Sequence, residues 1–253
     1  MRLPADMKKF LFETGDMARF SMRFFQEAFR PQFEIREFIH QCFVIGYQSL
    51  ALVALTAFIM GFVLTMQLRP TLVSYGVESM IPSMVGIAIV REIGPVLTAL
   101  IFAGKIGSSI GAELGSMKVT EQIDAMEVSG TNPYKYLVVT RTFATMLMLP
   151  VLVVLADTVS LFGSFLSVNT SETLTLKLFF SQVFEHLGYI DVIPAFIKSF
   201  FFGFTVGMVG CYKGYHSEKG TEGVGISANS AVVVSSVLIF VIDLLAVQFT
   251  EFF

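Results

Sequence analysis

The sequence predicts an all-α integral membrane protein with an N-terminal interfacial amphipathic helix and five transmembrane helices. Of its 253 residues, 54% are hydrophobic and 15% are charged, which gives more apolar surface than an ordinary soluble domain can bury. Five apolar stretches approach the roughly 20 residues that a helix needs to cross a bilayer. They run over residues 42–66, 81–103, 143–166, 192–211 and 231–249.

The chain is expected to form one domain, because no linker, low-complexity tract or internal repeat divides residues 1–253. Residues 1–40 would form the interfacial region and residues 41–253 the transmembrane core. The net charge of -3 is small, and nucleic acid is not expected as a ligand.

The basic residues predict the orientation. Alternate connecting segments, starting with the N-terminal one, carry 13 Lys and Arg residues, whereas the other connecting segments carry 2. Because cytoplasmic loops are enriched in Lys and Arg, we expect a cytoplasmic N-terminus and a periplasmic C-terminus.

The segment before the first span is rich in both signs of charge, which argues against a cleavable signal and favours a retained anchor. Its apolar residues recur at helical spacing opposite charged ones, which is typical of a helix lying in the membrane interface. A soluble helix packed on a partner is the alternative. The apolar positions are Met7, Phe10, Leu11, Met17, Ala18, Phe24, Phe25 and Ala28.

The second span contains two adjacent charged residues, Arg91 and Glu92, near its middle. A charge at the bilayer centre costs about 3 kcal/mol on insertion scales, so such residues normally face a protein interior or a cavity. Gly94 and Pro95 follow, and proline favours a kink by removing a backbone donor. The pair is therefore a functional-site candidate, with a purely structural Arg-Glu pair as the alternative.

Three more ionisable residues lie inside later spans: Asp157, Lys198 and Asp243. Arg91, Glu92 and Lys198 together suggest a polar patch on an apolar wall, suited to an amphiphile with an anionic head group. The alternative for Lys198 is a side chain that extends to the membrane surface.

Small residues follow the second span at a spacing of three or four, including a GxxxGxxxG run. This spacing allows two helices to approach closely. The run is not a phosphate-binding loop, because Ile106 follows Lys105 and no glycine occupies position 99. The glycines are Gly104, Gly107, Gly111 and Gly115.

Residues 112–127 fit one amphipathic cytoplasmic helix with an acidic face. That face is either solvated or a docking surface for a cytoplasmic partner. Its members are Glu113, Thr120, Asp124 and Glu127.

No disulfide or metal site is predicted from Cys42 and Cys211, because their positions lack paired or ligand-like spacing. The three histidines are also far apart in the sequence.

Three blocks of the sequence resemble the MlaE (YrbE) family of ABC-transporter permeases. The first is REIGPVLTALIFAGKIGSSIGAELGSMKVTEQIDAMEVSGTNPYKYLV, from Arg91 to Val138. The others are LMLPVLVVLAD, ending at Asp157, and TEGVG, from Thr221 to Gly225. The resemblance therefore extends over nearly the whole chain.

The resemblance implies a homodimeric permease in the bacterial inner membrane that moves phospholipid between that membrane and the periplasm, helping to maintain outer-membrane lipid asymmetry. It implies a separate cytoplasmic ABC ATPase that binds ATP and Mg, so this chain would be non-catalytic and would bind no cofactor. A STAS-domain accessory protein and a periplasmic MCE-domain protein are further expected partners.

The resemblance also assigns residues. It puts Arg91, Glu92 and Lys198 by the lipid cavity. Asp243 of the fifth span is also expected there, and the small residues Gly94, Pro95 and the glycine run are expected to serve helix packing. The resemblance makes the segment from residue 113 to residue 127 the helix that couples to the ATPase. The coupling residues would be Glu113, Lys118, Thr120, Glu121, Asp124 and Glu127.

Four positions depart from the family pattern. At Ile226 a basic residue is commoner, so a cytoplasmic charge contact there is in doubt. The others are Lys105 in place of arginine, Asn132 in place of aspartate and Thr140 in place of proline.

Two other functions fit less of the sequence. An ion-coupled secondary transporter could use Glu92, Asp157 and Asp243 as a proton relay. A membrane-embedded lipid-modifying enzyme would need a dense cluster of Asp, His or Cys near a membrane face, which the sequence does not offer.

Overall fold

The computed structural model describes residues 5–30, 33–170, 173–218 and 220–251, and within these ranges the regular structure is helical. Side chains of residues 5–11 lie outside the described part, so the predicted apolar positions Met7, Phe10 and Leu11 are not placed. The α-helices are α1 (Ala5–Ala28), α2 (Ile35–Ser74), α3 (Ile81–Ala88), α4 (Gly94–Phe102), α5 (Ser108–Val119), α6 (Gln122–Val128), α7 (Thr140–Asn169), α8 (Leu176–His186), α9 (Tyr189–Tyr215) and α10 (Thr221–Glu251).

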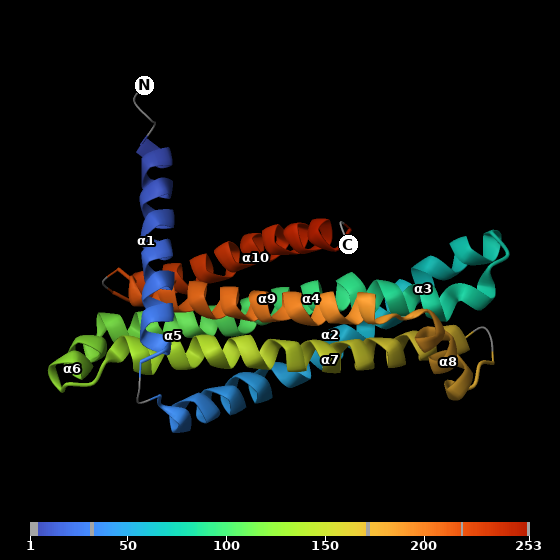
Figure 1. Ribbon diagram of the computed structural model, residues 1–253, viewed down its shortest axis with the longest axis horizontal. Helices are drawn as coiled ribbons and strands as arrows, with labels where there is room; N and C mark the ends of the chain where they lie inside the picture. Colours follow the sequence, from blue (N-terminus) through green and yellow to red (C-terminus); the bar gives the residue numbers. More distant parts are fainter. Residues whose placement is uncertain (1–4, 31–32, 171–172, 219, 252–253) are drawn as a thin grey trace.

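The prediction of five spanning helices is confirmed. Five helical stretches are long and apolar enough to cross a membrane, each extending beyond the predicted range: Ile35–Ser74, Glu78–Val119, Tyr134–Asn169, Tyr189–Tyr215 and Thr221–Thr250. They run along a common long axis, with α6 at one end and α3 and α8 at the other (Figure 1). Helix α7 lies against both α2 and α9, and α9 also packs on α10.

Helices α2 and α7 pack closely because small residues face each other. A Cβ atom added at Gly61 would collide with the backbone of Ser160, and one added at Gly163 would collide with the backbone of Phe58. Thr65 donates a hydrogen bond of 2.7 Å to the hydroxyl of Ser164. Close backbone approach and hydroxyl hydrogen bonds hold helices together where lipid removes the hydrophobic driving force.

The second span is a continuous but irregular helix. It begins with a 3-10 turn at Glu78–Met80, and π-helical turns at Ile89–Ile93 and Ala103–Gly107 separate α3, α4 and α5. A further π-helical turn, Tyr134–Val139, precedes α7. Such turns are often found at functional sites, and the turn at Ile89–Ile93 contains Arg91 and Glu92.

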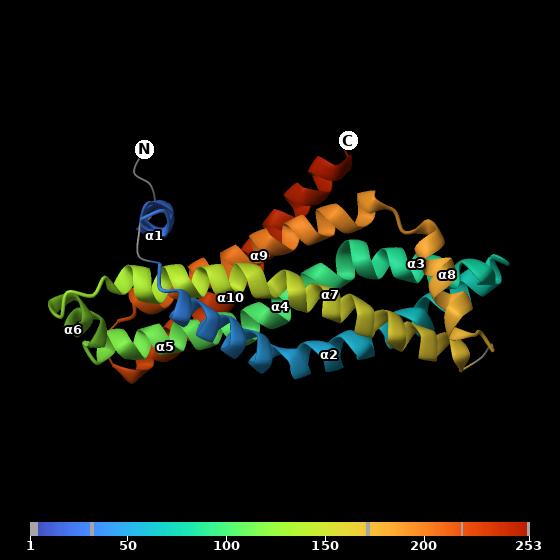
Figure 2. The same cartoon turned by 60° about the horizontal axis from the view of Figure 1, so that its bottom comes forward.

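Helix α1 crosses the bundle near the α6 end, roughly perpendicular to the long axis (Figures 1 and 2). Phe20 and Phe24 are buried in the core, and the hydroxyl of Tyr134 donates a 2.5 Å hydrogen bond to the carbonyl of Phe20. Phe12 and Phe25 remain exposed. An amphipathic helix is therefore present, and its position in the membrane interface stays a prediction.

The prediction of a single helix over residues 112–127 is wrong. Helix α5 ends at Val119 and α6 begins at Gln122, with Glu121 between them at a φ of 58°. This left-handed conformation is costly for a residue with a side chain and interrupts a right-handed helix. Glu113 therefore lies on a different helix from Asp124 and Glu127.

The predicted close packing holds for part of the glycine run. A Cβ atom at Gly111 would lie 3.2 Å from the Cα of Ala228, and one at Gly115 would lie 3.3 Å from the hydroxyl of Ser217. Gly107 faces Val206 at an ordinary contact distance. A Cβ atom at Gly104 would meet no other atom of the described chain within 4 Å, so a packing role for Gly104 stays a prediction.

Candidate functional site

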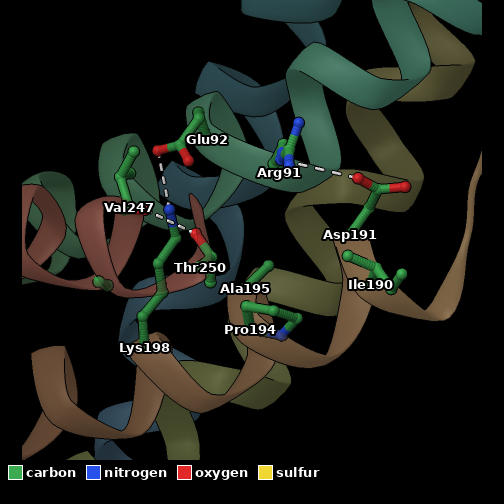
Figure 3. Close-up of a pocket in the computed structure, with 10 residues that line it drawn as sticks. Arg91, Glu92, Ile190, Asp191, Pro194, Ala195, Lys198, Val247 and Thr250 are labelled. Carbon is green, nitrogen blue, oxygen red and sulfur yellow. Dashed lines mark hydrogen bonds and ion pairs between the residues drawn. The ribbon is translucent and has the colours of Figure 1, made fainter. Parts of the chain in front are cut away.

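The centre of the candidate site is Lys198 on α9. Its side chain is buried, and the residue is 4% exposed. The ammonium donates hydrogen bonds of 2.8 Å to Glu92 Oε2 and of 2.8 Å to Asp243 Oδ1. Figure 3 shows the lysine directed toward Glu92 of the second span. Three membrane-spanning helices therefore meet at one cation, and Lys198 does not extend to the surface.

A second ion pair lies beside the first. Arg91 Nε is 3.6 Å from Asp191 Oδ1, and Figure 3 shows the two side chains approaching each other. Arg91 and Glu92 therefore have separate partners on α9 instead of pairing with each other. Asp191 and Lys198 are seven residues apart, so both lie on one face of α9.

Asp191 was missed by the sequence reasoning because it lies just outside the predicted fourth span. Its Oδ2 accepts a 3.0 Å hydrogen bond from the backbone N–H of Gly188. The available signal was its place three residues after Gly188, where an acidic side chain can cap a helix. Asp191 thus stabilises the start of α9 and also partners Arg91.

The two ion-paired groups have a mixed charge. Arg91 and Lys198 are opposed by the three carboxylates of Glu92, Asp191 and Asp243, so their formal sum is negative rather than positive. Buried charges are tolerated when they are paired and hydrogen-bonded. An anionic group can reach the buried Lys198 only by displacing a carboxylate, and a cationic group could bind the carboxylate released.

The cavity at these residues is small, at about 20 Å³, which is room for a water molecule. The rest of its lining is Ile190, Pro194 and Ala195 of α9 and Ala246, Val247 and Thr250 of α10. The cavity lined by the residues in Figure 3 is therefore too small for any ligand of lipid size. Arg91 is nonetheless half exposed, at 50% of its side chain, and could meet a ligand from the surface.

Asp157 does not join this cluster. It lies on α7, where its Oδ1 is buried without a hydrogen-bond partner among the residues described. This oxygen lies against Gly94, on the segment that follows Glu92. The structure therefore separates Asp157 from the Glu92 and Asp243 carboxylates with which a proton relay was considered.

The residues predicted to couple to an ATPase form two groups, and the first, on α5, consists of Glu113 and Lys118. Glu113 accepts a 2.8 Å hydrogen bond from the buried Arg141 of α7. Lys118 forms a 2.9 Å ion pair with Asp124 across the break between α5 and α6. The second group is exposed around α6 and consists of Thr120, Glu121, Asp124 and Glu127, with Val128 at 91% exposure.

The described side chains contain no group of three or more His, Cys, Asp or Glu residues that could hold a metal ion. Cys42 and Cys211 are free thiols. That the chain itself binds no metal or cofactor stays a prediction.

Comparisons with known proteins agree over most of the chain. A family model described as "Permease MlaE" matches residues 38–249. A probable ABC transporter permease of Rickettsia typhi is 37% identical over 240 residues, covering 95% of this chain and 93% of the relative. A probable ABC transporter permease of Synechocystis is 35% identical over 206 residues, covering 81% and 78%.

A plant relative is also similar. The Arabidopsis thaliana protein named "Protein TRIGALACTOSYLDIACYLGLYCEROL 1, chloroplastic" is 34% identical over 204 residues, which cover 81% of this chain and 58% of that protein. Its name refers to a glycerolipid that carries galactose.

Proposed function

The chain belongs to the MlaE permease family, and from this premise we propose that it moves phospholipid between a bacterial inner membrane and the periplasm. As an ABC transporter permease with five helices long enough to span a membrane, it is a multi-pass membrane protein and a transport subunit. The observation that carries the lipid proposal is the buried Lys198 bound by two carboxylates, next to the half-exposed Arg91.

Ion pairs inside a membrane support a head-group role. Ionisable residues in spanning helices are costly and commonly mark a substrate pathway. In the proposed binding step, a lipid phosphate replaces the carboxylates at Arg91 and Lys198, since both cations bind phosphate oxygens well. The small cavity then widens or is completed by a second copy of the chain, so that acyl chains lie on the surrounding apolar wall.

The charge balance favours a zwitterionic head group. A phosphate bound to Arg91 and Lys198 would neutralise part of the positive charge that now balances the carboxylates of Glu92, Asp243 and Asp191. An amine on the same head group would restore that balance, because its positive charge lies within a few ångströms of the phosphate. Purely anionic lipids would instead add to an existing excess of carboxylates.

The likeness to a protein with a glycerolipid in its name supports the lipid class. The further proposal that transport helps to maintain outer-membrane lipid asymmetry rests on the family resemblance. It would require the chain to work in the inner membrane of a bacterium with two membranes.

An ABC permease implies an ATPase partner. We propose that this partner is a separate cytoplasmic subunit that binds ATP and Mg and docks on the exposed acidic residues around α6. A homodimer of this chain, a STAS-domain accessory protein and a periplasmic MCE-domain protein complete the proposed complex. In that complex the chain would bind no cofactor of its own.

Purification of the tagged chain from its native membrane in mild detergent tests the proposal. Mass spectrometry of the purified material should identify an ABC ATPase and a phospholipid with a zwitterionic head group. Isolation of the chain without an ATPase, together with proton-driven transport by the chain alone, would instead establish the ion-coupled alternative.

A further inference from the structure

Asp157 is a half-buried acidic residue with a buried Oδ1 atom, and the ion-paired groups leave it unused. Its Oδ1 has no hydrogen-bond partner, and none of the ion pairs among the described residues includes it. A polar atom inside a membrane bundle without a partner is costly. A role for the side chain therefore has to come from the groups it touches.

The group it touches is Gly94. A Cβ atom added at Gly94 would overlap Asp157 Oδ1 and would also lie 3.0 Å from the carbonyl oxygen of Ile89. The carboxyl group of α7 therefore fills the space that a side chain on α4 would otherwise need. The contact requires glycine because no side chain fits beside Asp157. Backbone conformation is not the reason, since Gly94 has an ordinary helical φ of -58°.

The contact lies directly after the π-helical turn at Ile89–Ile93. The N–H of Gly94 donates to the carbonyl of Ile89 and so closes this turn, while Pro95 has no N–H to donate. The backbone hydrogen-bond ladder is therefore weakened where the turn joins α4, and contacts with neighbouring helices gain importance in setting its rotation.

Rotation matters here because Arg91 and Glu92 bind different groups on one face of α9. Arg91 reaches Asp191, and Glu92 reaches Lys198 seven residues further along. Successive residues of a helix point about 100° apart. A rotation of the turn by a fraction of that angle would remove at least one of the two partners.

We propose that Asp157 is a positioning residue, whose contact with Gly94 sets the rotation of the Ile89–Ile93 turn and keeps Glu92 in reach of Lys198. The contact depends on the shape of the side chain rather than on its charge. The consequence for lipid binding rests on the proposed function, whereas the consequence for the orientation of the turn does not.

A double-mutant cycle tests this contact, with phospholipid retained by the purified transporter complex as the first measurement. Gly94→Ala should lower retention about tenfold and Asp157→Ala about fivefold, whereas the double variant should return to within about twofold of the original chain, because the new methyl group fills the vacated space. Additive losses in the double variant would overturn the proposal.

Asparagine provides the matched control, because it keeps an oxygen at the same place without the charge. Asp157→Asn alone should retain phospholipid within about twofold of the original chain, and it should not rescue Gly94→Ala. A loss in Asp157→Asn as large as that in Asp157→Ala would show that charge, not contact, is needed, and would overturn the proposal.

The second measurement does not depend on lipid. Arg91→Cys in a background with Cys42→Ser and Cys211→Ala gives one thiol, whose labelling rate by a water-soluble reagent reports the orientation of the turn. Gly94→Ala should change this labelling rate severalfold, and adding Asp157→Ala to that variant should restore the original rate. An unchanged labelling rate in Gly94→Ala would overturn the positioning role. If the labelling rates change as expected but the purified complex contains no phospholipid, only the proposed function is overturned.

Discussion

At the scale of single residues, Lys198 links three membrane-spanning helices through two short ion pairs. Its loss would leave Glu92 and Asp243 close together without the ammonium between them. Removing one member of a buried ion pair is much more costly than replacing the whole group by neutral residues. Stability and lipid binding can therefore be separated at this position.

Lys198→Met should lower the apparent Tm of the detergent-solubilised protein by about 5 °C, a value that allows for the partial exposure of Glu92. Adding Glu92→Gln and Asp243→Asn should recover most of that loss. Neither variant should retain phospholipid. Differential scanning fluorimetry and lipid extraction measure the two effects, and an unchanged Tm in Lys198→Met would contradict the buried ion pairs.

Asp191 offers the opposite test, because it competes with a ligand for Arg91. Asp191→Asn keeps an oxygen that can accept from the N–H of Gly188 while it removes the negative charge. Retention of phospholipid should therefore rise about two- to fivefold, as expected for loss of a partly exposed ion pair. Lipid extraction measures the change, with Asp191→Ala as the control for loss of the cap; a decrease in Asp191→Asn would contradict competition at Arg91.

The sequence was sufficient to group Arg91, Glu92 and Lys198, because charges inside apolar spans need partners. It could not give the pairing. Arg91 and Glu92 are adjacent in sequence, yet the π-helical turn directs them to different residues of α9. Asp191 was missed because it lies just before residue 192, where the predicted fourth span begins.

At the scale of helices, the break between α5 and α6 changes the proposed coupling surface. The 3.6-residue periodicity of residues 112–127 is present in the sequence, but it carries no information about a single residue at positive φ. Glu121 provides that break. Asp124 and Glu127 consequently lie on a short helix at the end of the bundle, whereas Glu113 lies on α5, where it is exposed but paired with Arg141.

Charge reversal on α6 tests the coupling surface. Asp124→Lys together with Glu127→Lys should reduce lipid transport per ATP hydrolysed about tenfold, because like charges opposite a basic docking site cost several kcal/mol. Glu113→Gln is the matched control within the same sequence segment and should leave this ratio within about twofold, since its carboxylate faces Arg141. Simultaneous measurement of phosphate release and lipid transfer gives the ratio, and coupling that survives the double reversal would argue against docking at α6.

Helix α1 shows a different limit of the sequence reasoning. Its amphipathic character was predicted, but Phe20 was not among its predicted apolar positions. In the structure Phe20 is the central ring of a cluster with Tyr134, Tyr212 and Tyr215. Contacts between residues more than 100 positions apart leave no periodic signal in one sequence, so this cluster could not be derived.

At the scale of the whole molecule, the spans differ in how well the rest of the chain covers them. Helices α2 and α10 have the least buried apolar windows, while the other three spans are about half buried. In the membrane their uncovered faces would contact lipid or a second copy of the chain. The proposed homodimer would use such a face, and the small cavity near Lys198 would then lie close to the α10 surface.

Reconstitution into liposomes tests the central claim, which is ATP-driven movement of phospholipid through a site centred on Lys198. The purified permease with its ATPase should transfer a labelled zwitterionic phospholipid when ATP and Mg are added, and a proton gradient without ATP should have no effect. Lys198→Met with Glu92→Gln and Asp243→Asn should lower the transfer at least tenfold while the complex stays assembled, as expected for loss of charge-assisted contacts. Undiminished ATP-dependent transfer by this triple variant, or transfer driven by the proton gradient alone, would contradict the account.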